Sequence, residues 1–121
     1  MLTHPTAQAL VEGVAAWLPL DGSASPFALR VARNALDIAA RDMALGPAAD
    51  ERAACRIAAI LGRDDGPRDE LDRALVTAIR AGTIAPDDPQ LVAHLAASAL
   101  DHLAIDQPRY LHELDPNLTK R

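Results

Sequence analysis

Residues 25–47 constrain what this chain can fold into more than any other stretch of it. Large apolar residues recur there at steps of four and seven residues, a spacing that places side chains on one face of an α-helix: Phe27, Val31, Ile38 and Leu45. A polar stripe runs along the edge of that face: Arg30, Asn34, Asp37 and Arg41. The pattern predicts a long helix that buries its apolar face and holds an ordered set of polar groups at the border.

Both ends of this predicted helix carry local signals. The Ser25 hydroxyl can accept a hydrogen bond from a backbone N–H of the first turn, and Pro26 loses no intrahelical bond at the first helical position. At the other end, Gly46 tolerates positive φ and Pro47 cannot donate to a continuing helix. We therefore expect this helix to end near residue 45 and another to begin after Pro47.

Helical patterns of the same kind recur along the rest of the chain. They predict helices near residues 5–18, 26–45, 48–61, 69–81 and 88–105, followed by an irregular tail over residues 106–121. Gly62 and Gly82 are expected to end the third and fourth of these helices, and Asp88–Pro89 to begin the fifth. Abundant alanine favours helices and lets them approach closely, whereas β-branched residues are too scattered to form alternating strands. A length of 121 residues corresponds to one domain. The expected fold class is all-α, a compact single-domain bundle of about five helices over residues 1–121.

The expected core consists of the larger apolar residues on the inward faces of these helices: Leu10, Val14, Trp17, Phe27, Val31, Ile38, Ile57, Leu75, Ile79, Leu95 and Leu103.

The charge balance and the cysteine content exclude several classes of protein. The net charge is −5 and no run of five residues is basic, which argues against a nucleic-acid-binding protein. No apolar run is long enough to span a bilayer, and the first residues lack the features of a signal peptide. The single cysteine, Cys55, can form no internal disulfide. These properties predict a cytoplasmic protein that binds neither membranes nor nucleic acid.

One triplet has the residue types of a nucleophilic triad. Ser98, His102 and Asp106 are spaced four residues apart, so they lie in a row along one helix face. A triad needs groups that converge from different elements and an oxyanion hole, and this sequence has no glycine-rich turn to supply one. We therefore predict an exposed polar face here and no catalytic residues.

Metal and cofactor sites are also not predicted. No two of the four histidines are four residues apart, the spacing of a helical metal site. No glycine-rich phosphate-binding loop is present.

The environment of Cys55 allows two interpretations. It lies between Arg52 and Arg56 in sequence, and neighbouring positive charges would favour a reactive thiolate if the side chain were exposed. The interpretation we prefer is a small apolar residue packed in the interior, because free cysteines are usually buried.

A candidate anion site combines the long helix with the chain end. Arg30, Arg33 and Asn34 project from the helix, and Arg109 lies in the segment that follows the last helix. Guanidinium groups from both segments could bind a carboxylate or a phosphate between them. The alternative is a structural role, in which these side chains satisfy backbone groups where the last helix ends.

Pro108 disrupts the helix that precedes it and leaves backbone carbonyls without partners. We expect Asp106 and Tyr110 to form a polar junction there, with the Asp106 carboxylate paired to Arg30 or Arg33 and the Tyr110 ring packed across the same junction.

The segments FALRVARNALDIAARDMALGP and LDHLAIDQPRYL resemble the DUF6285 family of small bacterial proteins. The most specific parts of the resemblance are residues 30–32, Asn34 and residues 106–110. It implies a short helical protein with no assigned activity and supplies no catalytic residues. It also implies genes for phosphotransferase-like proteins and acyl-CoA dehydrogenases nearby, and hence an accessory role in acyl-CoA metabolism.

Two functional hypotheses follow. The favoured one is a non-catalytic accessory or protein-interaction domain, either a homodimer or the partner of the neighbouring phosphotransferase-like enzyme. The other is a small anion-binding domain or enzyme with its site between the long helix and the IDQPRY segment. A polar pocket lined by Arg30, Asn34 and Arg109 would favour the second hypothesis, and a broad apolar surface would favour the first.

Overall fold

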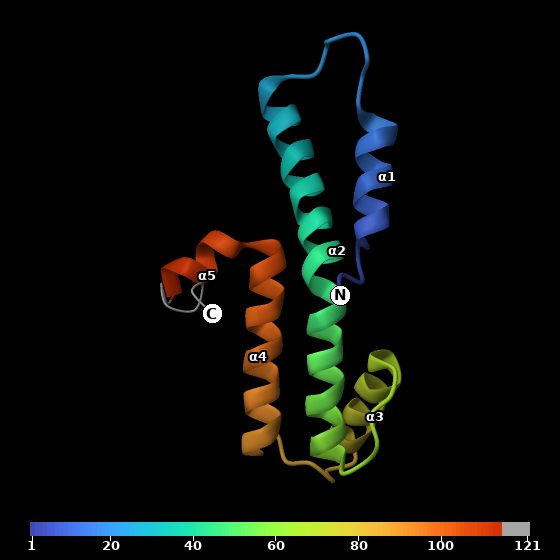
Figure 1. Cartoon of the computed structure of the whole chain (residues 1–121), viewed down its shortest axis with the longest axis vertical. Helices are drawn as coiled ribbons and strands as arrows, with labels where there is room; N and C mark the ends of the chain where they lie inside the picture. The colour runs from blue at the N-terminus through green and yellow to red at the C-terminus, as the bar shows by residue number, and fades with distance from the viewer. Residues whose placement is uncertain (115–121) are drawn as a thin grey trace. The chain divides into compact units, whose positions relative to one another are not determined.

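The computed structural model describes residues 1–114, and these residues form five α-helices and no strand (Figure 1). The helices are α1 (Ala7–Trp17), α2 (Pro26–Leu61), α3 (Arg68–Arg80), α4 (Pro89–Asp106) and α5 (Pro108–Leu114). The predicted all-helical fold class is therefore confirmed. The chain divides into two compact units, Met1–Pro47 and Ala48–Arg121, called here the first and second unit, and the boundary falls within α2. That the chain is a single domain stays a prediction.

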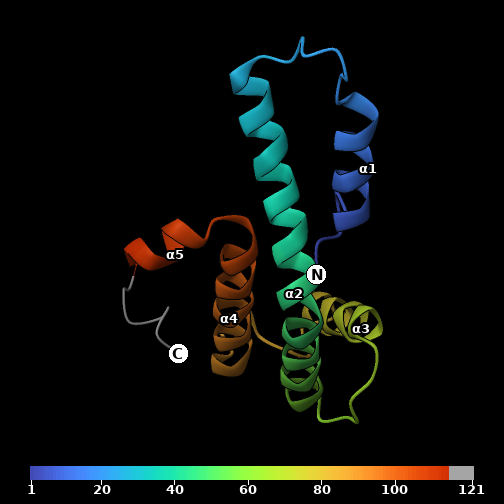
Figure 2. The same ribbon diagram turned by 45° about the horizontal axis from the view of Figure 1, so that its top comes forward.

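The first unit is a helical hairpin made of α1 and the part of α2 that ends at Pro47 (Figure 2). The hydroxyl of Thr6 accepts a hydrogen bond from the Ala9 N–H at 3.1 Å and caps α1. The hydroxyl of Ser25 accepts one from the Ala28 N–H at the same distance and caps α2, as the sequence predicts. Local side-chain chemistry thus sets both helix starts.

The predicted break at Gly46 and Pro47 is wrong, because α2 continues through both residues and is 36 residues long. Proline inside a helix removes one backbone hydrogen bond and costs about 3 kcal/mol, which tertiary packing on both sides of Pro47 has to outweigh. Gly46 is buried and does not have the positive φ of a helix-ending glycine. A Cβ at Gly46 would lie 3.2 Å from the Met1 nitrogen and 3.3 Å from an Asp42 carboxylate oxygen, so this glycine allows a close approach.

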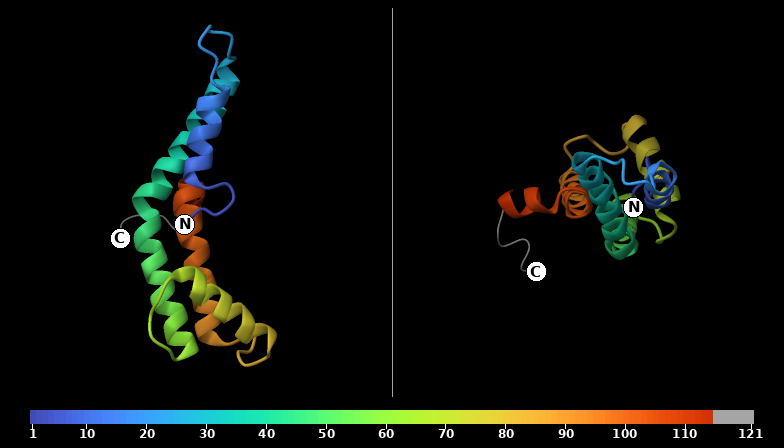
Figure 3. Two further views of the ribbon diagram at one scale, coloured as in Figure 1. Left: turned by 90° about the vertical axis from the view of Figure 1, so that its right-hand side faces the viewer. Right: turned by 90° about the horizontal axis from the view of Figure 1, so that it is seen from above.

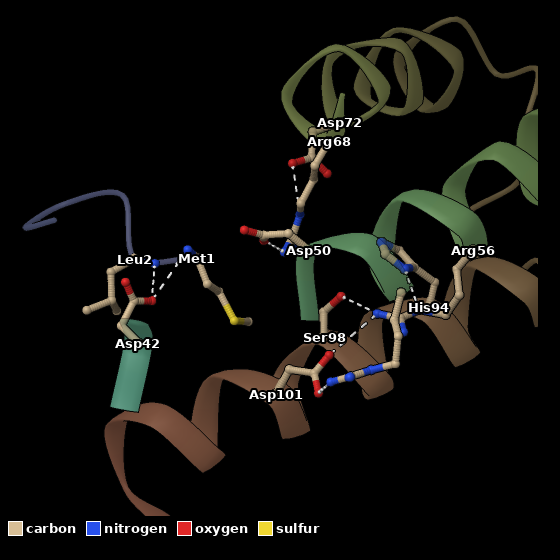
Figure 4. A network of polar contacts seen from close by, with 11 residues as sticks. Met1, Leu2, Asp42, Asp50, Arg56, Arg68, Asp72, His94, Ser98 and Asp101 are labelled. Carbon is tan, nitrogen blue, oxygen red and sulfur yellow. Dashed lines mark hydrogen bonds and ion pairs between the residues drawn. The ribbon is translucent and has the colours of Figure 1, made fainter. Parts of the chain in front are cut away.

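The segment before α1 is held by a buried carboxylate on α2. Asp42 is buried, and its Oδ1 accepts a hydrogen bond from the Leu2 N–H at 2.8 Å (Figure 4). The Met1 ammonium lies 3.4 Å from the same oxygen. Gly46 and Asp42 are one turn apart on α2, so the N-terminal segment lies against both residues.

The second unit contains the hydrophobic core. Figure 3 gives two further views of the ribbon that include α2, α3 and α4. Buried side chains of these three helices pack together: Ala54, Ile57, Ala58, Leu71, Leu75 and Leu91. Gly62 and Gly82 have φ values of 64° and 75° just after α2 and α3, which confirms them as helix-ending residues. The Asp88 carboxylate caps α4 by accepting the N–H groups of Gln90 and Leu91.

The chain after α4 is helical again, so the prediction of an irregular tail is wrong for residues 108–114. Pro108 ends α4 by excluding helical geometry from Gln107, which has φ −139° and ψ 68°. The same proline then occupies the first position of α5, where its missing N–H has no cost. Residues 115–121 of the predicted tail lie outside the described residues.

The predicted core is correct in the second unit at Ile57 and Leu75, which are buried. It is wrong at four positions, because Trp17, Phe27, Val31 and Leu95 are exposed. The remaining predicted core residues are half-buried: Leu10, Val14, Ile38, Ile79 and Leu103.

In α4 the buried face is rotated from the expected one and carries Leu91, His94 and Ile105. In the first unit the reason for the exposure is different: this unit contains two helices, α1 and the first part of α2. A two-helix hairpin cannot cover the wide apolar arc of α2.

Candidate functional site

An apolar groove of about 490 Å³ lies between α1 and α2 in the first unit. Apolar residues and glycine make up its entire lining: Ala9, Leu10, Gly13, Val14, Trp17, Phe27, Ala28, Val31, Ala32 and Ala35. Apart from the indole N–H of Trp17, the groove therefore offers no charged or hydrogen-bonding side chain to a ligand. Such a lining favours a partner that buries apolar surface.

The residue sizes along the two helices create the groove. Half of the lining residues are small, and small residues let two helix backbones approach closely. They come from both helices: Ala9, Gly13, Ala28, Ala32 and Ala35. Three of the larger lining side chains are well exposed, with Trp17 45%, Phe27 69% and Val31 54% exposed. Exposed aromatic and aliphatic side chains of this kind are typical of interaction surfaces.

The apolar stripe that the sequence places on α2 is not buried, and two of its residues, Phe27 and Val31, line this groove. Phe27, Val31 and Leu45 are exposed, and Ile38 is half-buried. In the whole first unit, the buried residues are Ala39, Asp42 and Gly46, none of which is a large apolar residue. Within the part of the chain that the structure describes, no large apolar side chain of this unit is therefore fully removed from water.

The second unit contains a network of polar side chains between α2 and α4 (Figure 4). Arg56 Nε donates a hydrogen bond to His94 Nδ1 at 3.1 Å, and Arg56 Nη2 donates to the Ser98 hydroxyl at 3.3 Å. The Asp101 carboxylate accepts from Arg52 at 3.0 Å and lies 3.8 Å from Arg56. The two arginines of α2 thus donate the hydrogen bonds of this network, and side chains of α4 accept them.

His94 is the buried member of this network, with 4% of its surface exposed. Burial, followed by the positive charges of Arg56 and Arg68, lowers the pKa of His94 below its ordinary value. Because its Nδ1 accepts the Arg56 hydrogen bond, the neutral ring carries its proton on Nε2. The ring is therefore an uncharged acceptor that holds Arg56 in place.

A second arginine extends the network to α3. Arg68 lies 2.7 Å from the Asp50 carboxylate on α2 and 3.4 Å from Asp72 on its own helix. Together with Arg56, it cross-links α2, α3 and α4 around their apolar core. Because these groups are occupied with one another, the arrangement supports a structural role for them.

The Ser98, His102 and Asp106 row does not form a triad. Ser98 is hydrogen-bonded to Arg56, a group that is permanently protonated and cannot act as a base. His102 and Asp106 are exposed on α4. No spacing in the sequence indicated the Arg56–His94 pair, since its members are 38 positions apart and meet only when α2 and α4 pack together.

The preference for a buried Cys55 is wrong, because the side chain is exposed on α2. Its thiol donates a hydrogen bond to the Asp65 carboxylate at 3.4 Å. This hydrogen bond, together with the negative charge of Asp65, raises the pKa of the thiol. The acidic neighbour thus opposes the effect expected from the adjacent arginines, and the thiolate is disfavoured.

The predicted anion site is distributed over both units. Arg30, Arg33 and Asn34 lie exposed on successive turns of α2 in the first unit. Arg109 is exposed on α5 in the second unit, so the site as a whole stays a prediction. The same holds for the polar junction: Asp106 is exposed at the end of α4, and Tyr110 is exposed on α5.

Two further properties concern residues 1–114. None of their helices is both long and apolar enough to cross a membrane. Nor do these residues include a group of three or more His, Cys, Asp or Glu side chains placed to hold a metal ion.

Comparison with known proteins gives one result. A family model described as "Domain of unknown function (DUF6285)" matches residues 20–110. No curated protein and no solved structure matches the chain. The matched range includes all of α2, α3 and α4, and thus one wall of the groove and the complete Arg56–His94 network.

Proposed function

Because the chain belongs to the DUF6285 family, whose description assigns no activity, we propose that it is a non-catalytic protein-interaction domain. Its contact surface is the apolar groove between α1 and α2 in the first unit. Binding there is driven by the burial of apolar area, which contributes about 25 cal/mol per Å² removed from water.

The observation that carries this proposal is the exposure of the groove's large side chains. Phe27 is 69% exposed although it belongs to a periodic apolar stripe. A contiguous exposed apolar surface bordered by polar residues marks an interaction site in a protein of this size. Arg30 and Asn34 supply that border on α2.

Two observations support the non-catalytic part of the proposal. The lining of the groove has no side chain that could transfer a proton or attack a substrate. In the second unit, Arg56 donates hydrogen bonds to His94 and to Ser98, so these polar groups are engaged within the fold.

The proposal includes partners of two kinds, a second copy of the chain or a larger enzyme. The resemblance in the sequence points to phosphotransferase-like and acyl-CoA-metabolising enzymes for the second kind. The cytoplasmic location expected from the lone Cys55 is part of the same proposal.

Site-specific photocrosslinking in living cells tests this function. A benzophenone amino acid replaces Phe27 at the groove or, as a control, Val92, which is 51% exposed on α4. We expect irradiation to produce protein adducts at position 27 and few at position 92. Adducts of equal yield at both positions, or adducts only at position 92, would show that the groove is not the contact surface.

A further inference from the structure

We infer that the partner of the apolar groove is a second copy of this chain, and that two hairpins pair to form a four-helix bundle. In this bundle α1 and the first part of α2 of each copy cover the groove of the other. This inference deepens the proposed function and rests on it, since it names the partner of the same surface.

The first argument is that the hairpin has no core of its own. Its buried residues are Ala39, Asp42 and Gly46, and of these Ala39 alone has an apolar side chain. Its large exposed hydrophobic residues are spread over both helices and the turn between them: Val11, Trp17, Leu18, Leu20, Phe27, Leu29, Val31, Leu36, Met43 and Leu45. A unit of this size needs further layers to remove such residues from water, and oligomerisation is the usual solution. A second hairpin supplies two more helices of matching length, which is the architecture of a four-helix bundle.

The second argument is that the groove is complementary in shape to itself. Because α1 and α2 are antiparallel, Trp17 and Phe27 stand at one end of the groove and Ala9 and Ala35 at the other. A two-fold axis across the middle of the groove would place the large end of each copy on the small end of its partner. Such isologous contacts, in which one patch meets its own copy, are the commonest type in soluble oligomers.

The third argument is the charge of this unit. Residues 1–47 contain three basic and four acidic side chains, whereas residues 48–121 contain nine basic and thirteen acidic ones. The lining of the groove has no charged residue. Two copies of the first unit can therefore approach each other with little repulsion, and no excess charge selects an oppositely charged partner.

The fourth argument is the available area. An aromatic side chain presents on the order of 200 Å². Trp17 and Phe27, at 45% and 69% exposure, thus contribute a large share of the apolar surface at the groove. Val31, at 54% exposure, adds to this surface, and a standard interface buries about 800 Å² per partner.

Sedimentation velocity over a wide range of concentrations tests the inference on the complete chain. The matched variants are Val31→Glu, at a groove residue 54% exposed, and Val92→Glu, at an α4 residue 51% exposed. We expect the wild type and Val92→Glu to have twice the monomer mass of 12.8 kDa, and Val31→Glu to be monomeric. Trp17 is the single tryptophan and lies in the groove, so its emission should shift to the blue as the wild type associates.

Far-ultraviolet circular dichroism establishes that each variant is helical. If Val31→Glu loses helix, Phe27→Gln replaces it, because a side chain so exposed contributes little to the folded monomer. A wild type that stays monomeric at all concentrations, or a dimer that survives the groove substitution, overturns the inference. A monomer that still crosslinks through position 27 to a different protein overturns only self-association, whereas a monomer without such crosslinks contradicts the proposed function as well.

Discussion

Replacing Arg56 with alanine should destabilise the second unit strongly, although this side chain is partly accessible to solvent. The substitution removes the hydrogen bonds to His94 Nδ1 and to the Ser98 hydroxyl, which are 3.1 and 3.3 Å long. A hydrogen bond involving a charged donor contributes about 1.5–3 kcal/mol, and an acceptor left buried without a partner costs about 1–3 kcal/mol. His94 is 4% exposed, so water cannot readily replace the arginine.

From these terms we expect Arg56→Ala to lower the free energy of unfolding by about 2–3 kcal/mol, since the terms overlap and the site can relax. For a chain of 121 residues this corresponds to a fall of roughly 10 °C in the melting temperature. Urea denaturation followed by far-ultraviolet circular dichroism measures the change by linear extrapolation.

The control is Arg73→Ala, which removes an arginine from another short ion pair. Arg73 lies 2.8 Å from Asp69 one turn earlier on α3, but both side chains are exposed. Exposed pairs of this kind contribute about 0.5 kcal/mol or less. If Arg56→Ala and Arg73→Ala lower the stability by similar small amounts, the network around His94 does not stabilise the fold and our reasoning about it is wrong.

Two further predictions concern Gly46 and His94. Helix propensity alone predicts that Gly46→Ala stabilises the protein by about 1 kcal/mol, but the added Cβ would lie 3.2 Å from the Met1 nitrogen. We therefore expect Gly46→Ala to lower the free energy of unfolding by about 1 kcal/mol, as measured by urea denaturation. The control Gly66→Ala adds its Cβ in open space and should be neutral or slightly stabilising. A Gly46→Ala variant that is more stable than the wild type would contradict the close approach. Because the pKa of His94 is lowered in the folded state, the unfolded chain takes up a proton first, so stability should be full above about pH 6.5 and fall as the pH drops below it. His94→Gln should reduce the slope of stability against pH in this range and exposed His102→Gln should not, and equal slopes in both variants would refute the prediction.

The features that depend on neighbouring residues could be predicted from the sequence. The Ser25 cap, the helix-ending Gly62 and Gly82 and the Asp88–Pro89 start of α4 are all present in the structure. Each involves hydrogen bonds or dihedral angles within a few residues, so the local sequence contains the whole cause. For the same reason, the all-helical fold class follows from composition and periodicity alone.

The sequence was insufficient to predict the features that depend on contacts between residues far apart in the chain. Gly46 and Pro47 have the local chemistry of a helix end, but the helix continues through both, and Gly46 lies against the N-terminal segment more than 40 positions away. Periodicity identified Phe27 and Val31 as one apolar face, but it could not indicate that nothing in the hairpin covers that face. The number of layers around a helix is a property of the tertiary structure.

In the candidate site, too, some features follow from the local sequence and others depend on the tertiary structure. The sequence by itself determined which side chains of the long helix are apolar and which are polar, and therefore that one of its faces has to leave water. The tertiary structure decided that apolar residues of α1 and α2 line an open groove, and that Arg56 and His94 are paired. Both depend on which helices become neighbours. That choice depends on the free energy of packing the entire chain and leaves no signal in the spacing of a single segment.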